Sequence, residues 1–444
     1  MDGPPRKGRD LSKIAFAISA AFFIFTYGVA VGTFQLFPFR LIQNGWYSTR
    51  AMRDDLSTAL GLRPGYFLAP ARYTSAGVTR HDRARTAPGL TLLQGFVDGG
   101  NELRLIRADG SVIHRWPVKF FDLFPDPTHI APAIKIPKRD WNAGTHGAQI
   151  LPDGSVVFNF DYAGTVKLDR CGRLQWTMPR MTHHSVEESE DGGFWIPSER
   201  YVENGSPFPE FKPPYAADTV LKVSSTGTIV MEISVLELLF KNNLQGLLLM
   251  SNPMMPVPNQ FIPHLNDVEE LSSTLAGRFP QFAAGDLLLS LRGLNLLMVV
   301  DPNTLKVKWH QVGQWLAQHD PDFEPNGTIS LFNNNNAETQ IDPALRHSTI
   351  LEVDPTTGAT SVKYGEGPHQ RMYSEILGKH QYLDFDGGHW LITEATAGRV
   401  FEVNSAGDLI WEYVNRFNDR EVAMIFDALR YPDQYFTVKD WTCR

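Results

Sequence analysis

The sequence predicts an all-β protein built as a six-bladed β-propeller, and three observations support this prediction. From about residue 89 to about residue 430, the 444-residue chain consists of short stretches of alternating apolar and polar residues separated by turn signals. One hairpin pattern recurs six times, and a strand pair precedes five of its copies. The 36 Gly and 30 Pro residues imply many tight turns. Six four-stranded units of this kind are typical of a propeller.

The repeated hairpin is an alternating strand, a turn that contains Gly, Asn, Asp or Ser, and a second alternating strand. In several copies the second strand ends near a Trp. The six copies cover residues 102–116, 164–176, 218–232, 295–309, 348–364 and 398–413. A long insertion at residues 233–262 begins like a helix and becomes rich in Met and Pro. It is expected either to cover the active face or to line the core.

Histidines recur at or just before the first strand of the repeated unit. They are His146, His184, His264 and His319, with His380 as a fainter fifth member. The innermost strand of each propeller blade lines the central channel, so side chains at these positions are expected to meet at one mouth of the channel. One such histidine is usually structural, but five in the same register favour a shared functional pocket. Because strand side chains alternate, only one of His183 and His184 can face inward, and we expect it to be His184.

The N-terminus carries a strong compositional signal. Basic residues precede a run without charged residues over residues 14–39, which is long enough to cross the membrane as a helix. We therefore expect a cytoplasmic segment at 1–13, a transmembrane helix at 14–39 and the propeller in the periplasm, in a single-pass inner-membrane protein. A cleaved signal peptide is the alternative. Residues 40–88 are expected to form a connector with a short amphipathic helix at 49–62, and residues 431–444 a C-terminal tail.

Charge and cysteine content exclude some functions. The net charge of −8 provides no basic face, which argues against a nucleic-acid partner. The two cysteines, Cys171 and Cys443, are too few for a metal–thiolate site. In an oxidising compartment they could form one disulfide that ties the tail to an early blade, but two unpaired thiols are the alternative.

Several motifs resemble the bacterial arylsulfotransferase family over roughly residues 90–415. They are HLNDVE (264–269), GDLLLSLRGLNLLMVVDP (285–302), QHDPDFEPNGTISLFNN (318–334), RMYSEI (371–376) and RVFEVNSAGDLIWEY (399–413). The resemblance implies a six-bladed periplasmic propeller. It also implies transfer of a sulfuryl group from a phenolic sulfate donor to a phenol acceptor through a sulfohistidine, without the nucleotide sulfate donor. We expect no cofactor and no metal. The chain lacks the close-spaced cysteine pair and the N-terminal β domain of the better-known members.

Carried over by motif, the resemblance makes His319 the nucleophile. It assigns His264 and Arg292 to the sulfate oxygens, and His146 or His184 to the rest of the anion pocket. Further substrate contacts are expected from Asn266, Ser374 and His380.

The chemistry of these residue types agrees with that assignment. Sulfuryl transfer, like phosphoryl transfer, requires donors for the equatorial oxygens, and a guanidinium with several imidazoles supplies them. For His319 to attack, one ring nitrogen must be unprotonated while a hydrogen bond on the other aims the ring. Asp320, Asp322 or a nearby backbone carbonyl is expected to accept that bond. A neighbouring histidine would protonate the leaving phenolate.

Each assignment has a structural alternative. Arg292 could pair with Asp286, Asn266 and Asp267 could form only an Asx turn, and the asparagine run at 333–336 is expected to be a solvated loop. The histidine ring could hold a metal, but an arginine in the same pocket disfavours a cation. At the level of the whole protein, the alternative to an enzyme is a non-catalytic propeller subunit docked on a membrane-protein complex through its N-terminal helix.

Overall fold

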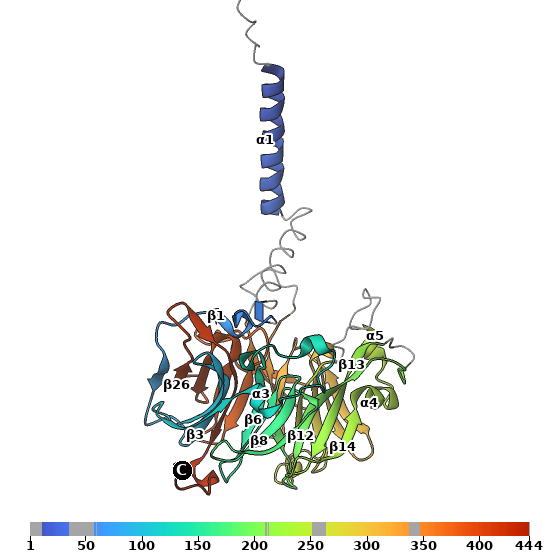
Figure 1. Cartoon of the computed structure of the whole chain (residues 1–444), viewed down its shortest axis with the longest axis vertical. Coiled ribbons are helices and arrows are strands. Elements are labelled where there is room, and N and C mark those ends of the chain that lie inside the picture. Colours follow the sequence, from blue (N-terminus) through green and yellow to red (C-terminus); the bar gives the residue numbers. More distant parts are fainter. Residues whose placement is uncertain are drawn as a thin grey trace, which may run out of the picture. The chain divides into compact units, whose positions relative to one another are not determined.

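The computed structural model describes residues 11–34, 57–58, 60–208, 211, 213–250, 263–336 and 347–443. The chain divides into two compact units, residues 1–65 and residues 66–444. The second unit is a six-bladed β-propeller, which confirms the predicted fold class (Figure 1).

Each blade is an antiparallel sheet in which successive strands run from the central channel to the rim. Two blades, given from the innermost strand outwards, are β6 (Thr145–Ile150), β7 (Val156–Phe160), β8 (Gly164–Leu168) and β9 (Leu174–Met178), followed by β10 (Met181–Thr182) with β11 (Glu187–Glu188), then β12 (Phe194–Val202), β13 (Tyr215–Val223) and β14 (Ile229–Ser234). The next two, in the same order of strands, are β15 (Leu265–Glu270), β16 (Leu287–Leu291), β17 (Leu296–Asp301) and β18 (Lys306–Val312), followed by β19 (His319–Phe323), β20 (Ile329–Asn333), β21 (Thr349–Val353) and β22 (Thr360–Tyr364). The last two are β23 (Lys379–Leu383), β24 (His389–Glu394), β25 (Arg399–Val403) and β26 (Leu409–Val414), followed by the closing blade of β28 (Ile425–Tyr431), β3 (Leu90–Val97), β4 (Gly100–Ile106) and β5 (Val112–Val118).

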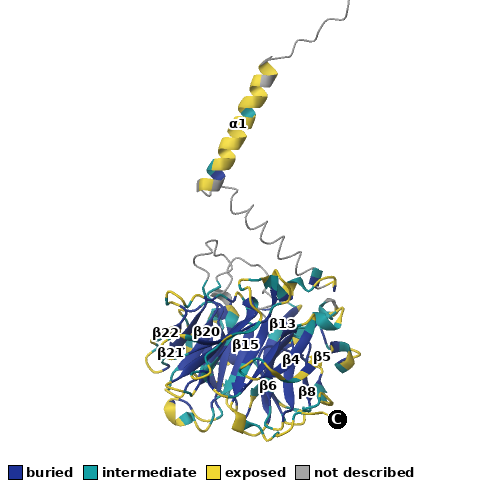
Figure 2. Cartoon of the chain, turned by 90° about the vertical axis from the view of Figure 1, so that its left-hand side faces the viewer, coloured by how far each residue is buried: buried dark blue, intermediate teal, exposed yellow. Residues whose placement is uncertain are grey.

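The hydrophobic core lies between neighbouring blades, and β16 shows why its strands are apolar throughout. One face of β16, including Leu287 and Leu289, packs on the preceding blade together with Val220 and Ile233. The other face, with Leu288, packs on the following blade. A strand buried on both faces reads as a continuous apolar run rather than an alternating one. Figure 2 shows the buried middle strands and the exposed rim loops.

The ring is closed by chain segments distant in sequence. The C-terminal strand β28 pairs with β3 and becomes the innermost strand of the first blade, which explains why the first hairpin has no preceding strand pair. β2 (Gly77–His81) adds a fifth strand to the blade of β23–β26, and β1 (Leu68–Pro70) pairs with β27 (Glu421–Ala423). Part of the segment expected as a connector is thus strand, because it covers sheet edges that would otherwise be unpaired.

The C-terminal tail is attached to the second hairpin. Cys171 and Cys443 form a disulfide with their Cα atoms 5.5 Å apart, which settles the alternative left open by the sequence. The Arg170 guanidinium donates to the Asp440 carbonyl oxygen at 2.5 Å, and the hydroxyl of Tyr435 donates to the Ile150 carbonyl oxygen at 2.8 Å. The tail is therefore an integrated part of the propeller surface.

The N-terminal run forms α1 (Leu11–Phe34), a 24-residue helix. In the part of the chain that the structure describes, no helix is both long enough and apolar enough to cross a membrane, which leaves the predicted anchor at 14–39 without support. Most of the predicted amphipathic helix at 49–62 lies outside the described residues.

Short helices occupy the insertions. α3 (Phe120–Leu123) follows β5, and α4 (Val235–Lys241) follows β14, where the Ser234 hydroxyl caps it by accepting from the backbone N–H of Glu237. α5 (Gly246–Met250) comes next, and the Met- and Pro-rich residues 251–262 lie outside the described residues.

Candidate active site

Four of the five predicted histidines meet at one mouth of the central channel, with His184 in the middle. The centroid of its ring lies 4.2 Å from that of His146, 5.3 Å from that of His264 and 6.0 Å from that of His319. The rings of His146, His184 and His319 are buried. The four come from four consecutive blades, so the cluster depends on ring closure and not on any local motif.

Irregular backbone at the start of the inner strands aims these side chains. Strand register shifts between Thr145 and Ala148 and again beyond His319, and His184 and His264 adopt left-handed conformations with φ of 56° and 57°. Such bulges turn a side chain out of the alternating pattern. At Gly147, next to His146, a Cβ atom would lie 1.8 Å from the carbonyl oxygen of His184. Glycine is therefore required where these two blades approach each other.

The hydrogen bonds of His319 define its tautomer. Its Nδ1 lies 2.7 Å from the Asn334 side-chain oxygen and 3.1 Å from the Ala317 carbonyl oxygen, and both are acceptors. The Asn334 amide nitrogen donates to the carbonyl oxygens of Ser374 and Leu377, at 2.9 and 2.6 Å, which fixes the amide oxygen towards His319. Nδ1 must therefore carry the proton, and Nε2 presents a lone pair.

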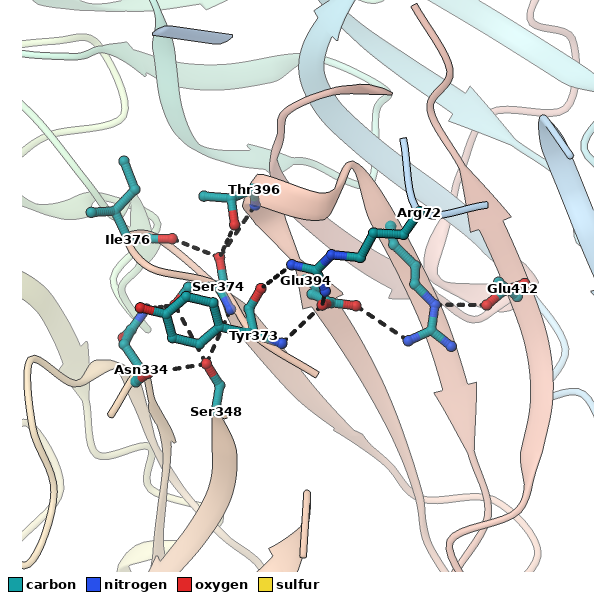
Figure 3. A network of polar contacts seen from close by, with 10 residues as sticks. Arg72, Asn334, Ser348, Tyr373, Ser374, Ile376, Glu394, Thr396 and Glu412 are labelled. Carbon is teal, nitrogen blue, oxygen red and sulfur yellow. Dashed lines mark hydrogen bonds and ion pairs between the residues drawn. The ribbon is translucent and has the colours of Figure 1, made fainter. Parts of the chain in front are cut away.

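Asn334 is the functional residue that the sequence interpretation missed. The asparagine run was expected to be a solvated loop, yet Asn334 is fully buried. Ser374, predicted to contact substrate, instead holds Asn334 through its backbone carbonyl. Its hydroxyl donates to the Ile376 carbonyl oxygen and accepts from the Thr396 backbone N–H (Figure 3).

Three histidines of the cluster, His184, His264 and His319, are held uncharged before an anion arrives. Burial is the main reason that the pKa of His264 falls to about 3, and the nearby Arg292 guanidinium lowers it further. Burial and Arg292 also hold the pKa of His319 well below its usual range. For His184, burial and the neighbouring His146 have the same effect on the pKa. The pocket thus combines one permanent cation with several neutral imidazoles.

Arg292 is available to a ligand at this mouth. Asp286, its alternative partner, instead forms an ion pair of 2.7 Å with Lys308. Among the described residues no carboxylate pairs with Arg292, whose backbone N–H donates to the carbonyl oxygen of His264 at 2.9 Å. This backbone contact places Arg292 next to His264, and its guanidinium is near enough to lower the pKa of His264 and of His319.

A family model for arylsulfotransferases (ASST) matches residues 147–416, more than half of the sequence. The chain belongs to the arylsulfotransferase family. The match includes His184, His264, Arg292 and His319, and it ends before the closing strand β28. No relative is found among curated proteins.

Solved structures similar to this arylsulfotransferase-family protein share little sequence with it. A protein of unknown function from Bacteroides caccae is 12% identical, with a TM-score of 0.49, over 77% of this chain and 98% of that chain. A streptogramin B lyase is 12% identical, with a TM-score of 0.40, over 80% of this chain and 88% of that one. Virginiamycin B lyase from Staphylococcus aureus is 12% identical, with a TM-score of 0.38, over 79% and 89%.

Two predicted site residues make contacts outside the anion pocket. The Asn266 amide donates to the Gln318 carbonyl oxygen at 2.7 Å and so links the starts of β15 and β19. His380 has its Nδ1 3.1 Å from Asp320 and its Nε2 2.6 Å from the Ser330 hydroxyl. The structure does not bring His380 together with the other four histidines, and Asp320, a candidate to orient His319, interacts with His380 instead.

His380 borders a cavity of about 360 Å³ further along the channel. The carboxylates that line it include Glu187, Asp267, Glu269, Asp320, Asp322, Glu324, Asp384 and Asp427. Burial raises the pKa of Glu187 to about 8 and that of Asp267 to about 7. The Lys379 ammonium lies 2.5 Å from Asp320 and 3.7 Å from Asp267, so it offsets negative charge close to the anion pocket.

Proposed function

We propose that this protein transfers a sulfuryl group from a phenolic sulfate ester to a phenol through a sulfohistidine on His319. The supporting observation is the geometry of His319, whose Nδ1–H is held by two acceptors so that Nε2 presents its lone pair beside Arg292 and three further histidines. Membership of the arylsulfotransferase family suggests the same activity.

The residues divide the chemistry between them. Arg292 and His264 bind the sulfate oxygens, and the guanidinium neutralises the charge that the anion brings into the pocket. His319 Nε2 attacks sulfur, the S–N bond forms, and the bond from sulfur to the phenolic oxygen breaks. The phenolate leaves as an anion that accepts a hydrogen bond from a neighbouring neutral imidazole N–H, and it takes its proton from water. The acceptor phenol, after losing its proton to water, attacks sulfur, the S–N bond breaks, and His319 is restored.

Neutral imidazoles suit this sequence of steps. A doubly protonated, cationic His319 could not attack, and the depressed pKa keeps its ring neutral, with Nε2 free of a proton, near neutral pH. A neutral imidazole still carries one N–H, so His264 and His184 can each donate one hydrogen bond to the anion. Arg292 then supplies the permanent positive charge, so His319 can stay neutral and keep its lone pair for attack.

The proposed cellular location is the periplasm. The Cys171–Cys443 disulfide supports it, because such bonds persist in oxidising compartments. The inner-membrane anchor stays a prediction. Alkaline extraction of membranes tests it: an integral protein remains in the pellet, whereas an exported soluble protein is released.

The activity is tested by phenolate release from a chromogenic phenyl sulfate, with and without a second phenol. The full chain is compared with His319→Ala and with His310→Ala, a control on the exposed rim strand β18. The proposal expects release that requires the acceptor, is lost in His319→Ala and persists in His310→Ala. Absence of release across a broad panel of donors, from folded protein, would contradict it.

A further inference from the structure

Behind His184, three buried polar side chains converge outside the anion pocket. His183 lies between β10 and β11, Glu199 on β12 and Asp218 on β13. Their exposed fractions are 0%, 4% and 4%. One ligand atom from each lies within 4.8 Å of the other two, and His183 Nε2 is 3.9 Å from an Asp218 oxygen.

Two of these groups lack the hydrogen bonds that burial demands. Within the described residues, His183 Nε2 and the Glu199 Oε2 atom have no hydrogen-bond partner. A buried polar atom left in this state costs about 1–3 kcal/mol. Asp218 accepts from the backbone N–H groups of His264 and Leu265, which fixes its position between two blades. His183 Nε2 and Glu199 Oε2 thus meet near one point, beside the fixed Asp218 carboxylate, without a partner for either atom among the residues that the structure describes.

A bound cation would satisfy both of these atoms, His183 Nε2 and Glu199 Oε2, and would offset the carboxylate charge that Glu199 and Asp218 bring into the interior.

We propose that His183, Glu199 and Asp218 bind a divalent transition-metal ion of the Zn²⁺ or Mn²⁺ class. One imidazole nitrogen with two carboxylates is a donor set for such ions, whereas Ca²⁺ and Mg²⁺ favour oxygen ligands alone. Glu199 also borders a separate cavity of about 350 Å³ lined by Arg180 and Met181 among others. This site is distinct from the histidine ring that faces the substrate.

Metal binding would set the tautomer of a residue in the anion pocket. His183 Nδ1 and His184 Nδ1 are 2.7 Å apart, so one of them must donate to the other. A metal on His183 Nε2 leaves the proton on His183 Nδ1, which then donates to His184. His184 in turn carries its proton on Nε2 and can offer it to the sulfate. This consequence rests on the proposed function, whereas the metal site itself does not.

Metal content tests the site without reference to activity. The full chain is stripped with a chelator, titrated with Zn²⁺ or Mn²⁺, and compared with Glu199→Gln, Asp218→Asn and the matched surface control Glu203→Gln. We expect one equivalent bound by the wild type and by Glu203→Gln, with a rise in melting temperature, and affinity lower by about 10- to 100-fold or more in the other two. Unchanged affinity in Glu199→Gln and Asp218→Asn, or no Zn²⁺ or Mn²⁺ bound by the wild type, would overturn the proposal.

The tautomer is read separately by ¹⁵N NMR of labelled histidine. With Zn²⁺ bound, the resonances of His184 should show a proton on Nε2, and Glu199→Gln should lose this signature while folded. In kinetics, metal removal should raise KM for the sulfate donor more than it lowers kcat. A preparation that binds metal but lacks turnover would contradict the proposed function alone. A preparation that turns over but binds neither Zn²⁺ nor Mn²⁺ on titration would contradict this inference alone.

Discussion

Replacing Asn334 with alanine removes the side chain that aims the nucleophile. His319 Nδ1 then keeps one of its two acceptors, the Ala317 carbonyl oxygen at 3.1 Å, so the tautomer survives but the ring is held less firmly. One neutral hydrogen bond is worth about 0.5–1.5 kcal/mol, and loss of an orienting partner costs about 10- to 100-fold in activity. We therefore expect kcat for phenyl sulfate to fall by about 10- to 100-fold.

The same substitution leaves the Leu377 carbonyl oxygen without its donor, at about 1–3 kcal/mol, and leaves the Ser374 carbonyl oxygen with only the Ser348 hydroxyl at 3.4 Å. Denaturant unfolding should therefore show a loss of stability beside the loss of kcat. Asn336→Ala serves as the control, because the Asn336 amide donates to the Glu375 carbonyl oxygen in a more exposed position. A folded Asn334→Ala protein with wild-type kcat would refute the argument that this amide orients the nucleophile.

Three further results are expected. Protonation of His319 to the imidazolium abolishes attack, and the pKa of His319 is depressed, so kcat/KM should be lost on acidification only well below pH 6.5. Half-maximal activity near pH 6.5 would contradict this. Gly147→Ala should abolish activity and destabilise the fold, because its Cβ would collide with the His184 carbonyl, whereas Gly192→Ala, with a similar φ of 78° and open space, should cost only about 1 kcal/mol. Cys443→Ser should lower the free energy of unfolding by about 2–5 kcal/mol under oxidising conditions and by nothing under reducing conditions, as measured by denaturant titration.

The repeat pattern was sufficient to predict the blades because each hairpin is a local unit. Ring closure was not visible in it: β28 pairs with β3 through partners such as Tyr431 and Leu90, which are far apart in the sequence. The strand β2 was missed for the same reason, since the described residues pair it with the distant β26. Pairing of this kind depends on the assembled ring and leaves no periodic signal in either segment.

In the candidate site, too, the sequence reveals residues that share a repeated strand position but not residues that only tertiary contacts bring together. The histidines could be placed together because they share a position at the start of inner strands. Asn334 could not, because four consecutive asparagines are typical of a loop, and its burial depends on Ser374 and Leu377, about forty residues later. His380 follows the first residue of β23, and its hydrogen bonds go to Asp320 and Ser330, which no pattern in its own blade indicates.

The most direct test of the central claim is to trap the intermediate. The protein is mixed with a phenolic sulfate in the absence of acceptor, quenched under alkaline conditions that preserve N-sulfated histidine, digested and analysed by mass spectrometry. The account predicts one sulfuryl group on the peptide that contains His319, discharged when a phenol is added. Turnover without any sulfated histidine, or a label that persists in His319→Ala, would contradict it.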